Sequence, residues 1–302
     1  MTQLPSPPRM RALYPGGPEV SSVAWGMWRF AGDDVAAAEA RIQAALDAGV
    51  TLFDTADIYG PDNGEPFGAA EALLGRVLAG NPGLRGRMVI ATKGGISMGV
   101  PYDSSASYLA AAIDASLARM GVDHVPLWQI HRPDLLTHPA EIGEALLTAH
   151  QAGKIGAVGV SNFTPWQVEA LAAHLPLPIV SCQPEFSPLA VAPLGDGVLD
   201  QAIARGMAVL AWSPLGGGRL GNPGDERTRA VAAALDAKAK QAGVSRAAAA
   251  YSWIMAHPAR PIPIVGTQSV PRIAEIPDAY TPTWTRAEWY EVLVAARGEP
   301  LP

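Results

Sequence analysis

Four side chains suited to proton transfer stand in the first half of the chain, each at or shortly after the end of a short apolar run. Asp54 and Tyr59 lie in FDTADIYG, Lys93 ends MVIATK and His131 ends LWQIH. A tyrosine has an ordinary pKa of about 10, and a neighbouring lysine ammonium favours the phenolate and lowers that pKa. An aspartate behind the lysine would hold the ammonium charged, and an imidazole would orient a carbonyl oxygen. The pattern predicts proton exchange between Tyr59 and a carbonyl or alcohol oxygen.

Polar and aromatic residues follow later apolar runs in the same way. Ser161 and Asn162 follow one run and Gln183 the next, and side-chain amides with a hydroxyl can hold a carboxamide. Trp212 ends a further run, and an exposed indole face stacks on a planar ring. Beyond the last run, Ser269 is a candidate helix N-cap with Arg272 one turn later. A helix N-terminus with an arginine is suited to bind a phosphate.

The elements that must position these residues alternate between strands and helices. Gly49, Gly86, Gly121 and Gly153 are 37, 35 and 32 residues apart, and with Gly206 they stand between a helical pattern and a strand. Glycine at such a place lets the helix end in a left-handed turn. Strands are predicted at 21–25, 51–54, 88–92, 125–130, 155–160, 179–182, 208–212 and 262–265.

Eight parallel strands with helices between them predict an α/β fold, a single (β/α)8 TIM barrel over residues 1–302. The proline-rich stretches 1–18 and 276–282 are predicted as surface coil, and 285–297 as an extra C-terminal helix. In such barrels the functional residues lie at the carboxyl ends of the strands. The barrel would therefore bring Asp54, Tyr59, Lys93 and His131 to one rim.

Composition excludes several other classes of protein. The 22 basic and 28 acidic residues are scattered and give a net charge of −6, so nucleic acid is not an expected partner. The single Cys182 excludes an internal disulfide and suits a reducing compartment. The sequence has neither the apolar core of a secretory signal nor a membrane-spanning run, so we expect a cytoplasmic protein without a membrane partner.

Two competing motifs fit less well, and a histidine metal motif is absent. GGGRLG at 216–221 matches the Rossmann glycine pattern, but Pro223 and Gly224 follow and prevent a helix from opening there. GISMG at 95–99 matches a hydrolase nucleophile motif, but it does not lead into a helix. The six histidines include no i, i+4 pair, so no metal site is expected.

The segments FDTADIYG, ATK, LWQIHRPD, GVSNF and WSPLGGG, in this order, resemble the aldo-keto reductase superfamily along nearly the whole chain. The resemblance is strongest to bacterial members with IHRPD and AWSxLGGGRL signatures. It implies an NAD(P)H-dependent enzyme that interconverts carbonyls and alcohols, with Tyr59 as general acid/base, Lys93 and Asp54 tuning it, and His131 orienting the carbonyl. Trp28, Tyr59 and His131 would contact the small-molecule substrate.

The resemblance also assigns a cofactor site, with the 213–219 loop around the pyrophosphate. NADP(H) is favoured and NAD(H) is the alternative, because this chain has Gly266 and Ile276 where many relatives carry Lys and Asn, while Arg272 and Glu275 remain. The residues assigned to the cofactor are Gly26, Met27, Asp54, Ser161, Asn162, Gln183, Trp212, Ser213, Pro214, Leu215, Gly216, Gly218, Arg219, Gly266, Thr267, Gln268, Arg272 and Glu275.

A second interpretation is a nicotinamide-nucleotide-binding redox sensor or regulatory subunit with slow turnover. Single-turnover chemistry would favour this sensor, whereas many turnovers with a simple aldehyde would favour the enzyme. The pattern leaves the substrate, the physiological direction and the oligomeric state open.

Overall fold

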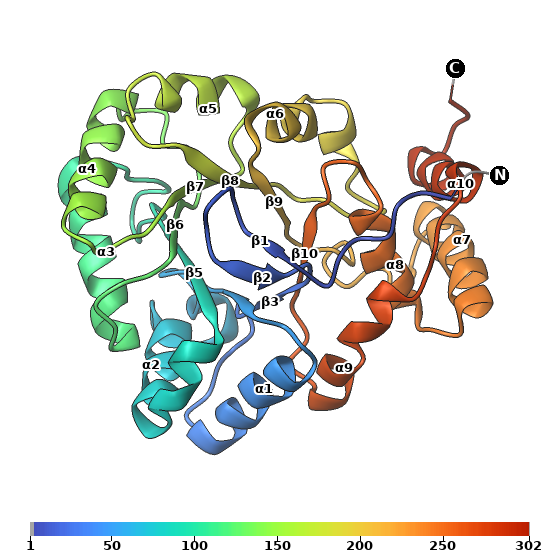
Figure 1. The fold of residues 1–302 in the computed structure, drawn as a ribbon, viewed down its shortest axis with the longest axis horizontal. Coiled ribbons are helices and arrows are strands. Elements are labelled where there is room, and N and C mark those ends of the chain that lie inside the picture. The colour runs from blue at the N-terminus through green and yellow to red at the C-terminus, as the bar shows by residue number, and fades with distance from the viewer. Residues whose placement is uncertain (1–2, 302) are drawn as a thin grey trace.

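Eight parallel strands close into a barrel in a computed structural model that describes residues 3–301. Each strand pairs with its sequence neighbour, and β10 closes the ring against β3 and β9. The predicted (β/α)8 barrel is therefore confirmed (Figure 1). The strands are β3 (Ala24–Gly26), β4 (Leu52–Asp54), β5 (Val89–Gly94), β6 (Leu127–Ile130), β7 (Val158–Ser161), β8 (Ile179–Gln183), β9 (Ala208–Ala211) and β10 (Ile262–Val265).

Helices surround the barrel and begin at the caps expected from their sequences. Asp34 caps the first of them by accepting a hydrogen bond from the backbone N–H of Ala37 at 2.9 Å. The helices around the barrel are α1 (Val35–Asp47), α2 (Ala69–Gly80), α3 (Ala106–Met120), α4 (Pro139–Gln151), α5 (Pro165–Ala172), α6 (Val198–Arg205), α8 (Arg246–Met255) and α9 (Val270–Ala274). Short 3-10 turns are η1 (Pro61–Asn63), η2 (Pro82–Arg87), η3 (Ala192–Leu194) and η4 (Ile276–Tyr280).

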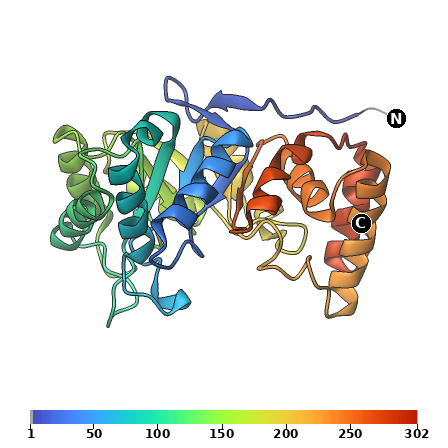
Figure 2. The ribbon, with the colours of Figure 1, turned by 90° about the horizontal axis from the view of Figure 1, so that it is seen from below.

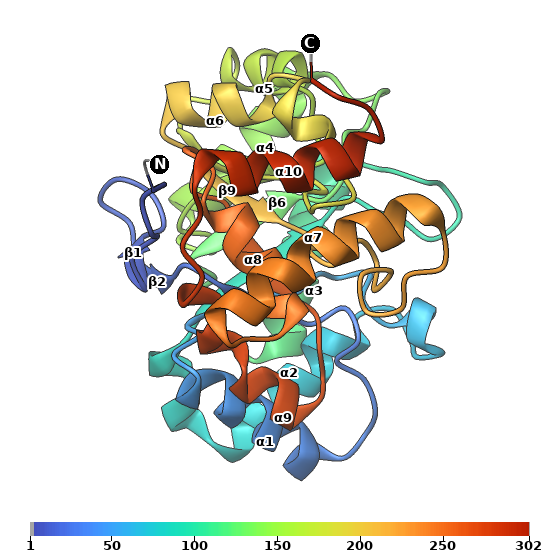
Figure 3. The same ribbon diagram turned by 90° about the vertical axis from the view of Figure 1, so that its right-hand side faces the viewer.

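Two further helices form an outer layer on one side of the barrel. The predicted C-terminal helix is confirmed as α10 (Arg286–Arg297), which packs against α7 (Glu226–Ala242), a helix inserted between β9 and α8 (Figures 2 and 3). The indole rings of Trp253 in α8 and Trp289 in α10 stack with centroids 4.7 Å apart. Among residues 3–301, no helix combines the length and the apolar character needed to cross a bilayer.

Four of the five glycines predicted to end helices have left-handed backbone. Gly49, Gly121, Gly153 and Gly206 have φ between 65° and 78°. The prediction for Gly86 is wrong, because α2 already ends at Gly80 and residue 86 lies inside η2. Pro82 explains the difference, since a proline at the start of a short 3-10 turn separates it from the preceding helix.

The surface coil predicted for residues 1–18 includes residues 1–2, which lie outside the described part of the chain. The prediction is wrong for residues 10–18, which belong to a hairpin that covers the amino-terminal end of the barrel. Strands β1 (Met10–Ala12) and β2 (Glu19–Ser21) pair antiparallel, and Figure 1 shows them across the barrel axis. Leu13 and Val20 are buried in a cluster with Leu52 and Leu127, the first residues of β4 and β6. The hairpin thus removes from water the apolar side chains that the strands present at this end.

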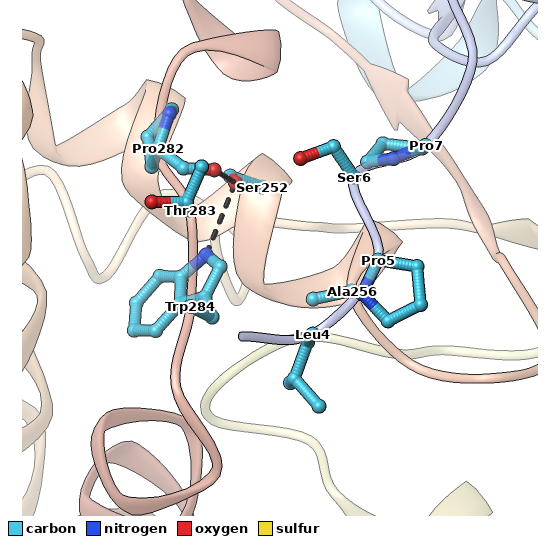
Figure 4. A pocket seen from close by; sticks show the side chains of 9 residues that line it. All are labelled: Leu4, Pro5, Ser6, Pro7, Ser252, Ala256, Pro282, Thr283 and Trp284. Atoms are coloured by element: carbon cyan, nitrogen blue, oxygen red, sulfur yellow. Dashed lines mark hydrogen bonds between the residues drawn. The ribbon is translucent and has the colours of Figure 1, made fainter. Parts of the chain in front are cut away.

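The proline-rich segment 276–282 is also more ordered than predicted. It contains η4, and the side chains of Ile276 and Ala279 are buried against α8. Directly after it, Trp284 Nε1 donates a hydrogen bond of 3.0 Å to Ser252 Oγ, and the backbone N–H of Leu4 donates to the Trp284 carbonyl at 2.7 Å (Figure 4). The amino-terminal segment is thereby fixed to the outer side of α8.

Polar residues concentrate in the carboxyl half of the barrel interior. The amino-terminal half holds apolar residues such as Leu52, Ala91 and Leu127. One pleat further along the same strands come Asp54, Lys93 and Gln129, all of them buried. Because alternate strand residues point to the same face, the barrel aims these polar side chains at its carboxyl rim.

Candidate active site

A buried ion pair forms the base of the candidate site. Lys93 is fully buried, and its Nζ donates hydrogen bonds to Asp54 Oδ2 at 2.6 Å and to the Thr55 carbonyl at 2.8 Å. Asp54 ends β4, and Lys93 is the penultimate residue of the adjacent β5. An ammonium removed from water needs such partners to remain charged. Burial alone would lower the pKa of Lys93, but Asp54 and Tyr59 raise it above its ordinary value.

Tyr59 and His131 lie directly above this pair. The Lys93 Nζ is 5.0 Å from the centre of the Tyr59 ring, and the Tyr59 and His131 rings meet edge to face at 5.9 Å. Tyr59 reaches this place from the turn after β4, and His131 follows β6 directly. The structure therefore brings together all four residues predicted for proton transfer. Asp54, Lys93 and His131 are buried, and Tyr59 is partly exposed.

The protonation states differ in one respect from the sequence-based expectation. Burial raises the pKa of Tyr59, whereas the Lys93 ammonium lowers it and Asp54 raises it, and the pKa ends above its ordinary value. The expected lowering by lysine is present, but burial outweighs it because the phenolate loses its hydration. Burial, Lys93 and Arg132 hold the pKa of His131 well below its ordinary value. The site thus carries a neutral phenol and a neutral imidazole at neutral pH.

A hydrogen-bond network links the ion pair to the far wall of the barrel. Gln183 Nε2 donates to Asp54 Oδ1 at 2.9 Å, and Ser181 Oγ donates to Gln129 Oε1 at 3.3 Å. Gln129 and Ser181 were not among the residues predicted from the sequence. A usable signal was their spacing, since each lies two residues before a selected residue and so points to the same side of its strand.

Asn162 is the centre of a second set of contacts at the ends of β7 and β9. Its Nδ2 donates to the His131 carbonyl at 3.1 Å and to Ser161 Oγ at 2.9 Å, while its Oδ1 accepts from Trp212 Nε1 at 2.9 Å. Asn162 has a left-handed φ of 61° and Ser213 one of 51°. Such backbone is costly for residues other than glycine and recurs at functional sites. The Arg132 guanidinium lies 6.0 Å from the Trp212 ring centre.

The loop after β9 contains the predicted pyrophosphate segment. Gly216, Gly217 and Gly218 all have left-handed φ, between 60° and 93°. Gly217 and Gly218 have open space where a side chain would start, and Arg219 is exposed beside them. Arg219 Nε donates to the Gly216 carbonyl at 2.9 Å, and exposed backbone with an exposed guanidinium fits the oxyanions of a pyrophosphate. Pro214 and Gly216 are buried beneath the loop.

The segment after β10 differs in one detail from its prediction. Ser269 is the N-cap of α9, but its side chain makes no capping hydrogen bond, and its backbone N–H instead donates to Thr267 Oγ1 at 3.3 Å. Gln268 donates to the Gly26 carbonyl at 3.3 Å. The side chains beyond, Arg272 and Glu275, are exposed. A Cβ placed on Gly266 would lie 3.7 Å from the Arg29 guanidinium.

Trp28 lies on the same rim, after β3. Its side chain is 41% exposed, and its Nε1 donates to Asp62 Oδ2 in η1 at 3.0 Å. Asn63 Nδ2 also donates to the Trp28 carbonyl, so the loops after β3 and β4 are joined. The neighbouring Met27 is fully buried, and its backbone N–H and carbonyl are bonded to the Asp54 carbonyl and the Phe30 N–H. Among residues 3–301, no group of three or more His, Cys, Asp or Glu could hold a metal ion.

Comparison with known proteins gives consistent matches along the chain. The model of the Aldo/keto reductase family matches residues 22–292. A "6-dehydroglucose reductase" of Novosphingobium aromaticivorans is 55% identical over 304 residues, covering 100% of both chains. A protein of the same name from Agrobacterium fabrum is 39% identical, covering 94% of this chain and 96% of that one. The solved glycerol dehydrogenase of Gluconobacter oxydans superposes with a TM-score of 0.81 at 26% identity, covering 99% and 97%.

Proposed function

Because the chain belongs to the aldo/keto reductase family, we propose that it is an NADPH-dependent reductase that converts the C6 aldehyde of a hexose to an alcohol, with Tyr59 as the proton donor. Carbonyl oxidoreduction follows from the family itself. The hexose substrate, the preference for NADPH and the role of each residue are the proposal.

The observation that carries this proposal is the position of Tyr59 above the Lys93–Asp54 pair and beside His131. A protonated phenol is the state required of an acid that donates to a carbonyl oxygen. The Lys93 ammonium stabilises the phenolate that remains, and the Asp54 carboxylate keeps the ammonium in place. The neutral His131 imidazole can donate one hydrogen bond that orients the carbonyl.

The cofactor would be held by the residues at the ends of β7 to β10. When bound, the nicotinamide supplies the hydride that the carbonyl carbon accepts. Gln183 retains its Oε1 as an acceptor for a carboxamide, because its Nε2 already donates to Asp54. Trp212 offers an indole face beside Asn162, and the exposed Gly217, Gly218 and Arg219 suit a pyrophosphate. Arg272 would contact the 2′-phosphate of NADPH.

The substrate class rests on the relatives. The two similar proteins named 6-dehydroglucose reductase cover nearly all of this chain. By its name their substrate is glucose with an aldehyde at carbon 6, and its reduction yields glucose. Trp28 is suited to this substrate, because a partly exposed indole packs against the apolar face of a sugar ring.

The test is steady-state reduction of 6-dehydroglucose with NADPH and with NADH, alongside glyceraldehyde as a smaller aldehyde. We expect many turnovers and a kcat/KM for 6-dehydroglucose at least about tenfold above that for glyceraldehyde, a difference of about 1.4 kcal/mol. Tyr59→Phe should bind NADPH normally but lose at least about a hundredfold in kcat. Tyr290→Phe, on the exposed face of α10, is the matched control.

Two results would contradict the proposal. Equal kcat in wild type and Tyr59→Phe would remove Tyr59 from proton transfer. Oxidation of only one equivalent of bound NADPH, without further turnover, would instead favour the redox-sensor interpretation.

A further inference from the structure

A second acidic side chain, Asp57, lies between Asp54 and Tyr59 in sequence but points away from the barrel interior. Its backbone N–H donates to the Lys93 carbonyl at 3.0 Å, which aligns it with the end of β5. Its Oδ2 is 3.0 Å from the place where a Cβ on Gly94 would lie, and the Trp128 indole edge approaches the same place to 2.7 Å. The carboxyl group therefore lies between the barrel wall and the helix layer, beside an aromatic ring.

This carboxyl group is buried without a hydrogen-bond partner. Asp57 is 1% exposed, and within residues 3–301 neither of its side-chain oxygens has a hydrogen-bond partner. An ionised carboxylate in such surroundings loses its hydration without compensation, which is unfavourable. A protonated carboxylic acid avoids most of that cost. The surroundings thus favour the neutral form of Asp57.

The cations nearest to Asp57 are already paired with other carboxylates. Glu71 in α2 is fully buried, and it accepts from Thr92 Oγ1 at 2.5 Å and from Arg119 Nε at 2.8 Å. Lys93, the other nearby cation, pairs with Asp54. Both cations around Asp57 therefore already have a carboxylate partner, and a third negative charge would be in excess.

From this arrangement we propose that Asp57 carries a proton at neutral pH, so that the buried turn before Tyr59 adds no negative charge near Lys93 and Tyr59. The charged or titratable groups that act on it are Glu71 from α2, Arg119 and Tyr108 from α3, Lys93 from β5, and Tyr59 from its own segment. Burial and the charge of Glu71 raise the pKa of Asp57 well above its ordinary value, against the opposite influence of Arg119, the Ile58 backbone and Lys93.

The consequence concerns the proton donor, so this inference rests on the proposed function of Tyr59. A negative Asp57 would raise the pKa of the Tyr59 phenol. The phenolate left after proton donation would then be less stabilised. A neutral Asp57 occupies its place between the barrel wall and the helix layer without this electrostatic penalty.

The first test is infrared difference spectroscopy of the cofactor-free protein at pH 7, wild type minus Asp57→Asn. We expect the C=O band of a protonated carboxylic acid to be lost in Asp57→Asn. Loss of a carboxylate band instead would overturn the proposal. Asp114→Asn, an exposed residue paired with Lys154, is the control and should lose only a carboxylate band.

A second variant keeps the test decisive if Asp57→Asn does not fold. Glu71→Gln removes the neighbouring negative charge and releases Arg119 while Asp57 stays buried, so the acid band of Asp57 should convert to a carboxylate band at a lower pH than in the wild type. Absence of a carboxylic acid band from both proteins at pH 7 would overturn the proposal.

The pH profile of kcat/KM separates a charge effect from a merely structural one. Asn mimics a neutral acid, so the alkaline limb of Asp57→Asn should stay within about half a pH unit of wild type, whereas Asp54→Asn should shift it clearly. A shift of about one unit or more to lower pH in Asp57→Asn would mean that Asp57 is ionised. The infrared band is measured without turnover. It therefore tests the protonation of Asp57 even if the proposed reaction is not observed.

Discussion

Gln183 Nε2 donates a hydrogen bond of 2.9 Å to Asp54 Oδ1, the carboxylate oxygen that Lys93 does not contact. β8 and β4 lie four places apart in the ring of eight strands, so this bond crosses the barrel interior. It joins the half of the rim proposed to hold the cofactor to the half proposed to transfer the proton. A substitution of Asp54 should therefore remove a contact on each side of the site, to Gln183 and to Lys93.

The Lys93–Asp54 pair should contribute to stability as well as to activity. Lys93→Met leaves a buried carboxylate without its cation, which should lower the free energy of unfolding by about 3–5 kcal/mol and reduce kcat by orders of magnitude. Urea unfolding and steady-state kinetics measure the two effects. Lys154→Met, which removes an exposed ion pair with Asp114, should cost under about 1 kcal/mol. Similar stability losses in both variants would contradict the role of burial.

Burial of His131 should make the folded protein less stable on mild acidification. The pKa of His131 in the folded protein lies well below the unfolded value, so below a pH of about 6.5 the unfolded chain binds a proton at this residue that the folded one does not. The His131 contribution to the free energy of unfolding should then decrease by up to about 1.4 kcal/mol per pH unit as the pH falls from about 7 to 5, whereas the raised pKa of Asp57 acts in the opposite direction. The free energy of unfolding of wild type minus that of His131→Gln, measured by urea unfolding, should therefore decrease over this range. Parallel curves would show that the pKa of His131 is the same in the folded and the unfolded protein.

Arg272 should distinguish the two nicotinamide cofactors. It is exposed after β10, where a guanidinium can bind a 2′-phosphate through paired hydrogen bonds. Arg272→Ala should weaken NADPH binding about tenfold and leave NADH binding nearly unchanged, as measured by calorimetric Kd values. Arg286→Ala, on α10, should affect neither. Equal weakening of both cofactors would assign Arg272 a structural role.

Gly94 should tolerate no side chain. A Cβ there would come within 2.7 Å of Trp128 and 3.0 Å of Asp57, so Gly94→Ala should destabilise the protein by about 1–3 kcal/mol. Gly80→Ala, at the end of α2 with open space around it, should be neutral or stabilising by up to about 1 kcal/mol. Thermal unfolding compares the two. An unchanged melting temperature in Gly94→Ala would show that the Trp128 and Asp57 side chains can move enough to admit a methyl group.

Periodicity and order along the chain were enough to predict the barrel, because each of its strands pairs with its sequence neighbour and each helix packs locally. The convergence of Asp54, Lys93 and His131 also followed from the sequence, since parallel strands bring their carboxyl ends to one rim. The amino-terminal hairpin was missed because its strands have three residues each and gain stability only from apolar contacts with distant strands.

By itself, then, the sequence determined which residues reach the carboxyl rim, because strand order and the two-residue alternation of side chains are local properties. Only the tertiary structure decided the state of those residues. The raised pKa of Tyr59, the lowered pKa of His131 and the partnerless carboxyl of Asp57 all depend on burial and on neighbours distant in sequence. Desolvation and charge act through space, and no spacing along the chain specifies them.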